Sequence, residues 1–348
     1  MKNLFLLLFA AVIFMSCGGG QQSTETEQIA EEFAGLQAKS STFFGQFPSA
    51  APNEANPSSE AKILLGHTLY FDNRLSKEGN ISCNSCHNLE TYGVDNLPTS
   101  PGDDGTLGTR NSPTVLNAAL HISQFWDGRE PDVEAQAGGP VLNPVEMAMP
   151  NEAFVMDRLK GIEGYKELFT NAYPGEEDPY TYHNLKNAIG VFERELLTPS
   201  KFDMYQAGNV SELSNSEQKG LQTFIDQGCI TCHMGTLLGG SMYQKMGLFA
   251  NYAETIGSEK DDLGKFEVTE KENDKYMFKV PSLRNIAQTG PYFHDGAVES
   301  LSESVKIMGK IQLNKDLTDE QVGEIVTFLK TLTGEVPEEY QTAPAMPL

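Results

Sequence analysis

The chain of 348 residues is long enough for two domains, and its 39% hydrophobic residues are enough for cores of ordinary composition. This composition excludes a collagen-like chain and a wholly disordered one. The formal net charge of −23 disfavours contact with nucleic acid and with anionic lipid, so we expect no nucleic-acid partner.

The chain begins with the pattern of a secretion signal. Lys2 precedes an apolar run that is short for a membrane span, and small residues follow before Cys17. The stretch FMSC resembles the lipobox of bacterial lipoproteins, so we predict a lipoprotein signal peptide over residues 1–16 and lipidation of Cys17. An ordinary signal peptide with a spare thiol is the alternative. Residues 17–50 are then expected to be a flexible tether that holds an exported, periplasm-facing protein on a membrane by its lipid anchor.

Amphipathic segments in both halves of the chain predict a mainly α fold with little sheet. In the first half these segments are residues 61–72, 152–169 and 182–197. Residues 201–209 join the halves, and the predicted domains are residues 51–205 and 206–348.

Two helices of the second half carry signals for their ends. One has an N-cap at Ser214 or Ser216 and then an apolar face of Leu221, Phe224 and Ile225. The other begins near Thr318 and Gln321, which have the spacing of a capping box, and is predicted to stop at Gly334.

Four of the five cysteines belong to two C-x-x-C-H motifs. The motifs are Cys83, Cys86 and His87, and Cys229, Cys232 and His233. Thiols three positions apart can reach the two vinyl groups of one porphyrin, while the adjacent histidine binds the iron. A zinc half-site or a redox dithiol is the alternative for a single motif. Two motifs without further cysteines to complete a metal site instead favour two covalent c-type haems.

Three further stretches carry a resemblance to a known family. RNSPTVLNAALHISQFWDGRE, GGPVLNPVEM and KVPSLRNIAQTGPYFHDGAVESLSESVKIMG resemble the bacterial dihaem cytochrome c peroxidases and their MauG-like relatives, over about residues 65–332. The resemblance implies two cytochrome c-like domains, each with one haem. It also implies that the N-terminal haem reduces hydrogen peroxide, and that the C-terminal haem accepts electrons from a small cytochrome c or cupredoxin.

The resemblance assigns the sixth ligand of the C-terminal haem to Met308, since these peroxidases carry a methionine there. Met242 and Met246 are competing candidates, and a core methionine is the structural alternative. MauG-like members have a tyrosine at this place. Met308 therefore argues against their high-valent chemistry on a protein substrate.

The resemblance also implies the residues around peroxide. Glu146 matches a distal glutamate that takes a proton from peroxide and returns it to the leaving oxygen, although a solvent-facing glutamate is the alternative. Gln136 and Phe125 match positions that orient peroxide and exclude water. Trp126, the only tryptophan, matches a ring that carries electrons between the haems, and it can also simply fill the interface.

A calcium site between the domains is implied by Asn111, Thr289 and Pro291, because oxygen ligands suit this hard cation. The family also implies a homodimer. His294 is expected to be a hydrogen-bonding group near the active region. His67 and His121 have no ligand role in the family pattern, so we expect surface or hydrogen-bonded histidines.

Many of these peroxidases carry a histidine sixteen residues after the proximal one, which blocks the peroxidatic iron until the other haem is reduced. Here that position is Asp103, in a turn-forming TSPGDDG segment. We therefore expect the face of the iron opposite His87 to be open in the oxidised protein, and the enzyme to need no reductive activation. A MauG-like oxidase of a protein or organic substrate, and a dihaem electron carrier without catalysis, are the alternatives to a peroxidase.

Overall fold

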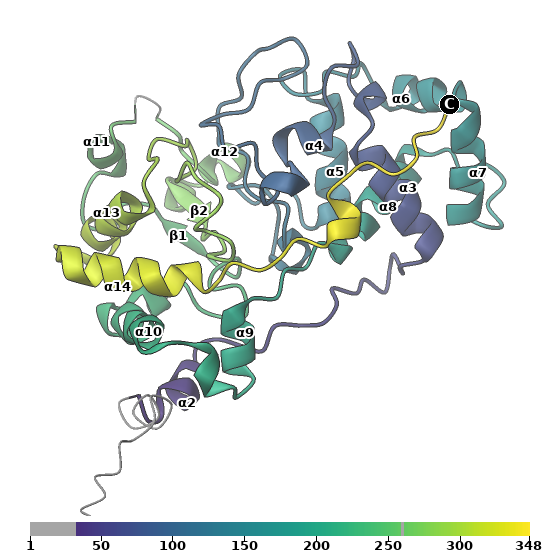
Figure 1. Cartoon of the computed structure of the whole chain (residues 1–348). Coiled ribbons are helices and arrows are strands. Elements are labelled where there is room, and N and C mark those ends of the chain that lie inside the picture. Colours follow the sequence, from purple (N-terminus) through teal and green to yellow (C-terminus); the bar gives the residue numbers. More distant parts are fainter. Residues whose placement is uncertain (1–32, 259–260) are drawn as a thin grey trace, which may run out of the picture.

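The computed structural model describes residues 33–258 and 261–348 (Figure 1). The predicted signal peptide, Cys17 and residues 17–32 of the predicted tether lie outside the described residues. No helix in the described part of the chain is both long and apolar enough to cross a membrane.

The first half of the chain forms a helical domain. Its helices are α3 (Glu60–Tyr70), α4 (Cys83–Cys86), α5 (Val133–Leu142), α6 (Glu152–Lys160), α7 (Glu163–Ala172) and α8 (Tyr182–Glu195). α8 packs against α3 and α5, and α7 packs on α3. Their apolar faces meet in a core that includes Leu65, Phe169 and Leu185. The segment expected over 152–169 is divided into two helices because α6 ends at Gly161.

The second half forms another helical domain (Figure 1). Its elements are α9 (Lys201–Gln206), α10 (Asn215–Gln227), β1 (Tyr243–Lys245), α11 (Tyr252–Ile256), α12 (Phe266–Thr269), β2 (Met277–Lys279), α13 (Leu301–Leu313) and α14 (Asp319–Lys330). α10 packs along α14, α13 packs on α14, and β1 pairs antiparallel with β2. Short 3-10 turns occupy Asn73–Leu75, Leu89–Thr91, Ala118–Leu120, Val210–Glu212, Cys229–Thr231, Glu272–Asp274 and Glu338–Tyr340. The prediction of a mainly α fold is confirmed.

The ends of the two long C-terminal helices test the predicted caps. α10 begins after Ser214, whose side chain accepts from the amide of Glu217, and ends at Gly228 with φ of 90°. The capping box of Thr318 and Gln321 is present at the start of α14. The predicted stop at Gly334 is wrong, because α14 already ends at Lys330. The amide of Gly334 instead donates to Asn285 at 2.9 Å, in a chain segment that has left the helix.

Each domain contains one helix crossing that only a glycine permits. A Cβ atom on Gly66 of α3 would lie 2.0 Å from the carbonyl oxygen of Ala188 on α8. A Cβ on Gly220 of α10 would lie 2.1 Å from the carbonyl oxygen of Glu324 on α14. The two glycines therefore let backbones approach closely at one helix pair in each domain.

The two ends of the described chain cross to the opposite domains. Leu36 and Phe44 are buried in the C-terminal core, and α2 (Leu36–Ser40) contacts α9 and α10. The Phe44 ring lies 5.5 Å from that of Phe202. Residues 33–50 are thus not the flexible tether that we predicted. The segment is mostly polar, but its apolar side chains Leu36 and Phe44 are buried in the core of the C-terminal domain.

The C-terminal segment runs back over the N-terminal domain, toward α3, α6 and α7 (Figure 1). The Tyr340 ring packs 5.5 Å from His67 and 5.3 Å from Phe192, and His67 Nε2 lies 3.0 Å from the carbonyl oxygen of Thr342. His67 is therefore a packed, hydrogen-bonded residue and not a surface one.

The predicted domain boundaries need two corrections. Residues 335–348 lie outside the C-terminal domain to which we assigned them. The boundary predicted after residue 205 also falls inside α9, whose Phe202 and Tyr205 are buried in the C-terminal core. Residues 201–209 were predicted to join the halves, but the buried rings of Phe202 and Tyr205 make the start of this stretch part of the C-terminal domain.

Candidate functional site

The first cysteine motif lies on α4. Ser82 and Ser85 form a capping box around its first turn. Both Cys83 and Cys86 are free thiols, and burial raises their pKa values to about 12 and about 11. The metal-free thiols are therefore protonated at neutral pH, which is the form that adds to haem vinyl groups.

His87, which follows α4, is held as a neutral imidazole. Burial lowers its pKa, although nearby Asp95 and the carbonyl groups of Pro113 and Gly93 oppose the shift. The hydroxyl of Tyr70 donates to the His87 carbonyl at 2.5 Å and fixes the backbone. A neutral ring at the end of the motif is the form that binds iron.

Glu146 lies in the turn after α5, where it is partly buried. Burial raises its pKa, and the positive charge of Arg129 and a hydrogen bond with Asn143 limit the rise. Its charge also contributes to the raised pKa of Cys86, so the carboxyl lies near the first cysteine motif. A carboxyl with a raised pKa is suited to give and take protons near neutral pH.

Arg129 connects this carboxyl to a second predicted site residue. Its guanidinium carbon lies 3.3 Å from the centre of the Phe125 ring, and that ring lies near Gly139 on the helix that carries Gln136. Phe125 has φ of 65°, a left-handed backbone that a bulky residue rarely adopts. The structure thus brings Phe125 and Glu146 around Arg129, a residue that sequence reasoning missed. The sequence could have pointed to Arg129, because it belongs to the FWDGR stretch that contains Phe125 and Trp126.

Asp103, at the position where many of these peroxidases carry a blocking histidine, is held by hydrogen bonds to the backbone. Its carboxylate accepts from the amides of Glu78 at 2.5 Å and Asn80 at 3.1 Å. Burial opposes its ionisation, but these hydrogen bonds and one from Ser76 outweigh it, so the pKa is lowered. The loop is also pressed against the Glu146 turn, because a Cβ on Gly102 would lie 2.1 Å from the Val145 carbonyl oxygen.

The second motif opens into a cavity of about 230 Å³, far larger than the ~10–15 Å³ that one water needs. Cys229, Cys232 and His233 line it together with Met308 from α13. The Nδ1 atom of His233 lies 3.0 Å from the carbonyl oxygen of Leu238. A carbonyl only accepts, so Nδ1 carries the proton and Nε2 keeps its lone pair for a metal.

These residues fit a covalently bound haem. The cavity is mostly apolar, it has two free thiols and an iron-binding nitrogen at its edge, and it has a thioether on its lining. Of the competing methionines, Met246 also lines the cavity whereas Met242 does not. Among the described residues no three His, Cys, Asp or Glu side chains gather as a metal site, so the zinc alternative gains no support.

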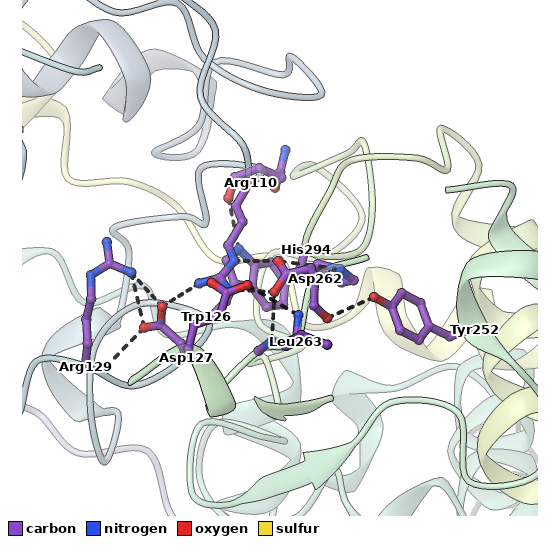
Figure 2. Close-up of polar contacts among 11 residues, drawn as sticks. Arg110, Trp126, Asp127, Arg129, Tyr252, Asp262, Leu263 and His294 are labelled. Atoms are coloured by element: carbon purple, nitrogen blue, oxygen red, sulfur yellow. Dashed lines mark hydrogen bonds and ion pairs between the residues drawn. The ribbon is translucent and has the colours of Figure 1, made fainter. Parts of the chain in front are cut away.

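Trp126 lies between the two domains (Figure 2). Its indole Nε1 donates to the carbonyl oxygen of Asn111 at 2.9 Å, and its own carbonyl accepts from the amide of Lys279 at 2.8 Å. The ring meets that of His294 edge to face, with centroids 6.3 Å apart. His294 in turn stacks on Phe278 at 4.3 Å. The tryptophan is therefore anchored to both halves of the chain.

A charged network braces the same interface (Figure 2). Arg110 pairs with Asp127 on its own domain and, at 2.6 Å, with Asp262 of the other domain. Burial opposes the charge of Arg110, but these carboxylates raise its pKa. His294 lies 3.9 Å from the same Asp262. Sequence reasoning missed this network because its members lie 17 and 152 residues from Arg110.

The three residues of the predicted calcium site border the same cavity. Asn111, Thr289 and Pro291 all line the cavity, although they come from different domains. The Asn111 amide group donates to the Leu97 carbonyl at 2.9 Å, which leaves its side-chain oxygen as a candidate ligand.

Comparison with known proteins agrees with this geometry. Residues 60–211 match the family described as di-haem cytochrome c peroxidase. The chain is 45% identical to cytochrome c551 peroxidase of Nitrosomonas europaea over 79% of this chain and 80% of that protein. It is 42% identical to the Pseudomonas aeruginosa protein of the same name over 89% of this chain and 90% of that protein.

The chain belongs to the di-haem cytochrome c peroxidase family. The predicted family and enzyme class are thereby confirmed. A solved MauG-like protein associated with microbial copper homeostasis has the same fold, with a TM-score of 0.77 and 28% identity over 86% of this chain and 97% of that one. Two haems and a peroxidase reaction are what membership in this family supports.

Proposed function

We propose that the protein reduces hydrogen peroxide to two waters, using two protons and two electrons from a small cytochrome c or cupredoxin. Cys229 and Cys232 would hold the haem that receives these electrons, and Cys83 and Cys86 would hold the haem that reduces peroxide. Trp126, at the interface of the two domains, is the proposed electron route between them. Each bound haem supplies an iron that changes its redox state. The observation that carries the proposal is a partly buried Glu146 with a raised pKa near the first cysteine motif.

The protein groups around the first haem have separate tasks in this reaction. The Glu146 carboxylate accepts a proton from hydrogen peroxide and returns it to the departing oxygen, so that water leaves. Phe125 and Gln136 orient peroxide and keep other water out. His87 and His233 would bind the two irons, and Met308 would supply a thioether to the second site. A thioether ligand favours the reduced iron, which makes the second haem the electron acceptor.

The first iron is proposed to be open, or to hold only water, in the oxidised protein. Asp103 supports this, because its carboxylate oxygens are already hydrogen-bonded to the amides of residues 78 and 80. Spectroscopy of the oxidised protein, followed by peroxide turnover with a reduced cytochrome, tests it. We expect one high-spin and one low-spin haem and no lag. Two low-spin haems, or a lag that pre-reduction removes, would contradict the open site.

The same measurements separate the alternatives. A non-catalytic carrier would show two low-spin haems and no peroxide turnover. A MauG-like oxidase would keep its activity on an organic or protein substrate without a cytochrome donor. Met308 on the lining of the second cavity argues against that chemistry.

A calcium ion at Asn111, Thr289 and Pro291 is proposed to hold the domains together. Their shared place on the lining of one cavity, from both halves of the chain, supports this. Calorimetric titration of the chelator-treated dihaem protein should show tight binding of one Ca²⁺ per chain. Equal binding by Asn111→Ala would remove this assignment.

Export, anchoring by lipidated Cys17 and a homodimer are further proposals from the sequence pattern and the family. Mass spectrometry of the mature protein tests the anchor, since an acylated Cys17 should be its first residue. Sedimentation of the purified dihaem protein tests the dimer.

A further inference from the structure

The cavity beside the second motif has a single charged side chain on its wall. Among the described residues that line it, Lys279 is the one lysine or arginine, and neither an aspartate nor a glutamate contributes. Lys279 is the last residue of β2 and is only 6% exposed. Its backbone amide donates to the carbonyl of Trp126 at 2.8 Å, which holds the residue at the domain interface.

The amine of Lys279 has neutral partners only. Its Nζ donates to the carbonyl oxygen of Ser123 at 2.7 Å and lies 3.0 Å from Nδ1 of His121. An ammonium group has three N–H donors, so one donor is left after these two contacts. Burial lowers the pKa of Lys279 to about 7, and the charge of Asp127, which is not in contact, opposes the shift. A buried ammonium of this kind is costly without an anion.

His121 adds a second donor at the same wall. When Lys279 is charged, its ammonium donates a hydrogen bond to Nδ1 of His121, so the ring hydrogen is on Nε2. That Nε2 atom is buried and has no hydrogen-bond partner. The ring packs closely against Gly240, since a Cβ there would lie only 2.9 Å from the Cδ2 atom of His121. Two positively polarised groups therefore line a mostly apolar cavity that lacks a carboxylate.

We propose that Lys279, supported by His121, is the carboxylate-binding site for a propionate group of the haem attached at Cys229 and Cys232. The inference rests on the proposed haem binding and adds to it a counter-charge. A haem has two propionates that must find partners when buried. Lys279 with its unfilled third donor meets that need inside the cavity that the cysteines and His233 border.

The pairing has a consequence for electron transfer. A ferric haem carries one more positive charge than a ferrous haem, so a fixed cation nearby disfavours the ferric form. Lys279 would then raise the midpoint potential of the second haem, in the same direction as Met308. It acts as a positioning and tuning residue for the cofactor and not as a catalytic residue.

The experiment compares the dihaem protein with its Lys279→Met variant by spectroelectrochemistry of both haems. Lys245→Met is the matched control, because Lys245 lies on the paired strand β1 but is exposed. We expect Lys279→Met to lower the midpoint potential of the second haem and to leave that of the first unchanged. Lys279→Arg, which keeps the charge, and Lys245→Met should stay close to the wild type.

Haem content, measured by mass spectrometry, distinguishes failure of this proposal from failure of the proposed function. Two haems with an unchanged second potential in Lys279→Met would overturn the assignment and leave the peroxidase proposal standing. A wild-type chain without haem at Cys229 and Cys232 would instead contradict the proposed function. If Lys279→Met does not fold with two haems, the wild-type pH dependence decides. A midpoint potential of the second haem that does not change with pH around pH 7 supports an ammonium paired with a propionate. A midpoint potential that falls near pH 7, the haem-free pKa of Lys279, would show that Lys279 loses its proton there and would overturn the proposal.

Discussion

At the scale of single residues, the two carboxyl groups near the first motif have opposite surroundings. Glu146 has a raised pKa because burial outweighs its contacts with Arg129 and Asn143. Asp103 has a lowered pKa because backbone amides outweigh burial. One carboxyl is thereby set to exchange protons, and the other is set to hold a loop in its ionised form.

Replacing Glu146 with Gln should lower peroxide turnover by about 10²–10⁴-fold, which is the usual contribution of a general acid–base group. The wild-type kcat/KM should fall as pH drops through the raised pKa of Glu146, above the ordinary value of ~4.3 for glutamate. Steady-state kinetics across pH, at normal haem content, checks both expectations. A variant with wild-type rates would show that another group moves the proton.

Replacing Asp103 with Ala should destabilise the protein by about 1–3 kcal/mol at pH 7, because two backbone amides lose a charged acceptor. Since the pKa of Asp103 is lowered on folding, its stabilisation is present above its unfolded pKa of ~3.9 and is lost as pH falls through the folded value. Thermal unfolding at pH 7 and in acid measures the difference.

The neighbouring Asp104→Ala is the control for this comparison. The Asp104 carboxylate is exposed and bonds only within its own turn, to the amide of Thr106. A loss of stability as large as that of Asp103→Ala would show that the loop responds to any change of charge.

At the scale of elements, each domain depends on a helix pair that glycine brings close together. Gly66 and Gly220 occupy the middle of α3 and α10, where glycine is otherwise unfavourable by about 0.5–1 kcal/mol relative to alanine. The close approach to Ala188 and Glu324 explains why glycine is used there.

Gly220→Ala should destabilise the second domain by about 1–3 kcal/mol, because the new methyl group meets the Glu324 carbonyl at 2.1 Å. Gly323→Ala, on α14, is the matched control, since no atom lies within 4 Å of the place that its Cβ would occupy. That variant should be stabilised by about 0.5–1 kcal/mol. Chemical unfolding of both dihaem variants checks the opposite signs. Equal effects would mean that the crossing adjusts without cost.

At the scale of the whole molecule, the two domains are joined by more than one chain crossing. Residues 33–48 pack on the C-terminal domain, and the chain after Gly334 returns to the N-terminal domain. The Arg110 network and Trp126 lie at the interface of the two domains, and their contacts reach both domains. A rigid interface of this kind is suited to hold two redox groups at a fixed separation.

Trp126→Phe should lower steady-state peroxide turnover while haem content stays normal. Phenylalanine keeps an aromatic ring at the interface but loses the hydrogen bond to the Asn111 carbonyl and the indole. Stopped-flow reduction by the donor separates the steps, because the second haem should still be reduced at the normal rate. Unchanged turnover would leave Trp126 with a packing role only.

The sequence by itself determined the features that depend on neighbouring residues. The C-x-x-C-H motifs, the cap at Ser214 and the capping box of Thr318 and Gln321 each lie within a few positions of chain. Amphipathic periodicity was enough for α3, α8, α10 and α14, but α5 and α13 were not predicted. The resemblance to the peroxidases then supplied Glu146 and Trp126 as candidates, which spacing alone does not single out.

Only the tertiary structure decided which distant groups meet. His67 contacts the chain 275 residues later, and Asp103 binds amides 23 and 25 residues earlier. Lys279 became a candidate ligand-binding residue only when its amine was found alone with neutral partners in a cavity. Contacts of this kind leave no local pattern, because they depend on which surfaces the packed helices bring together.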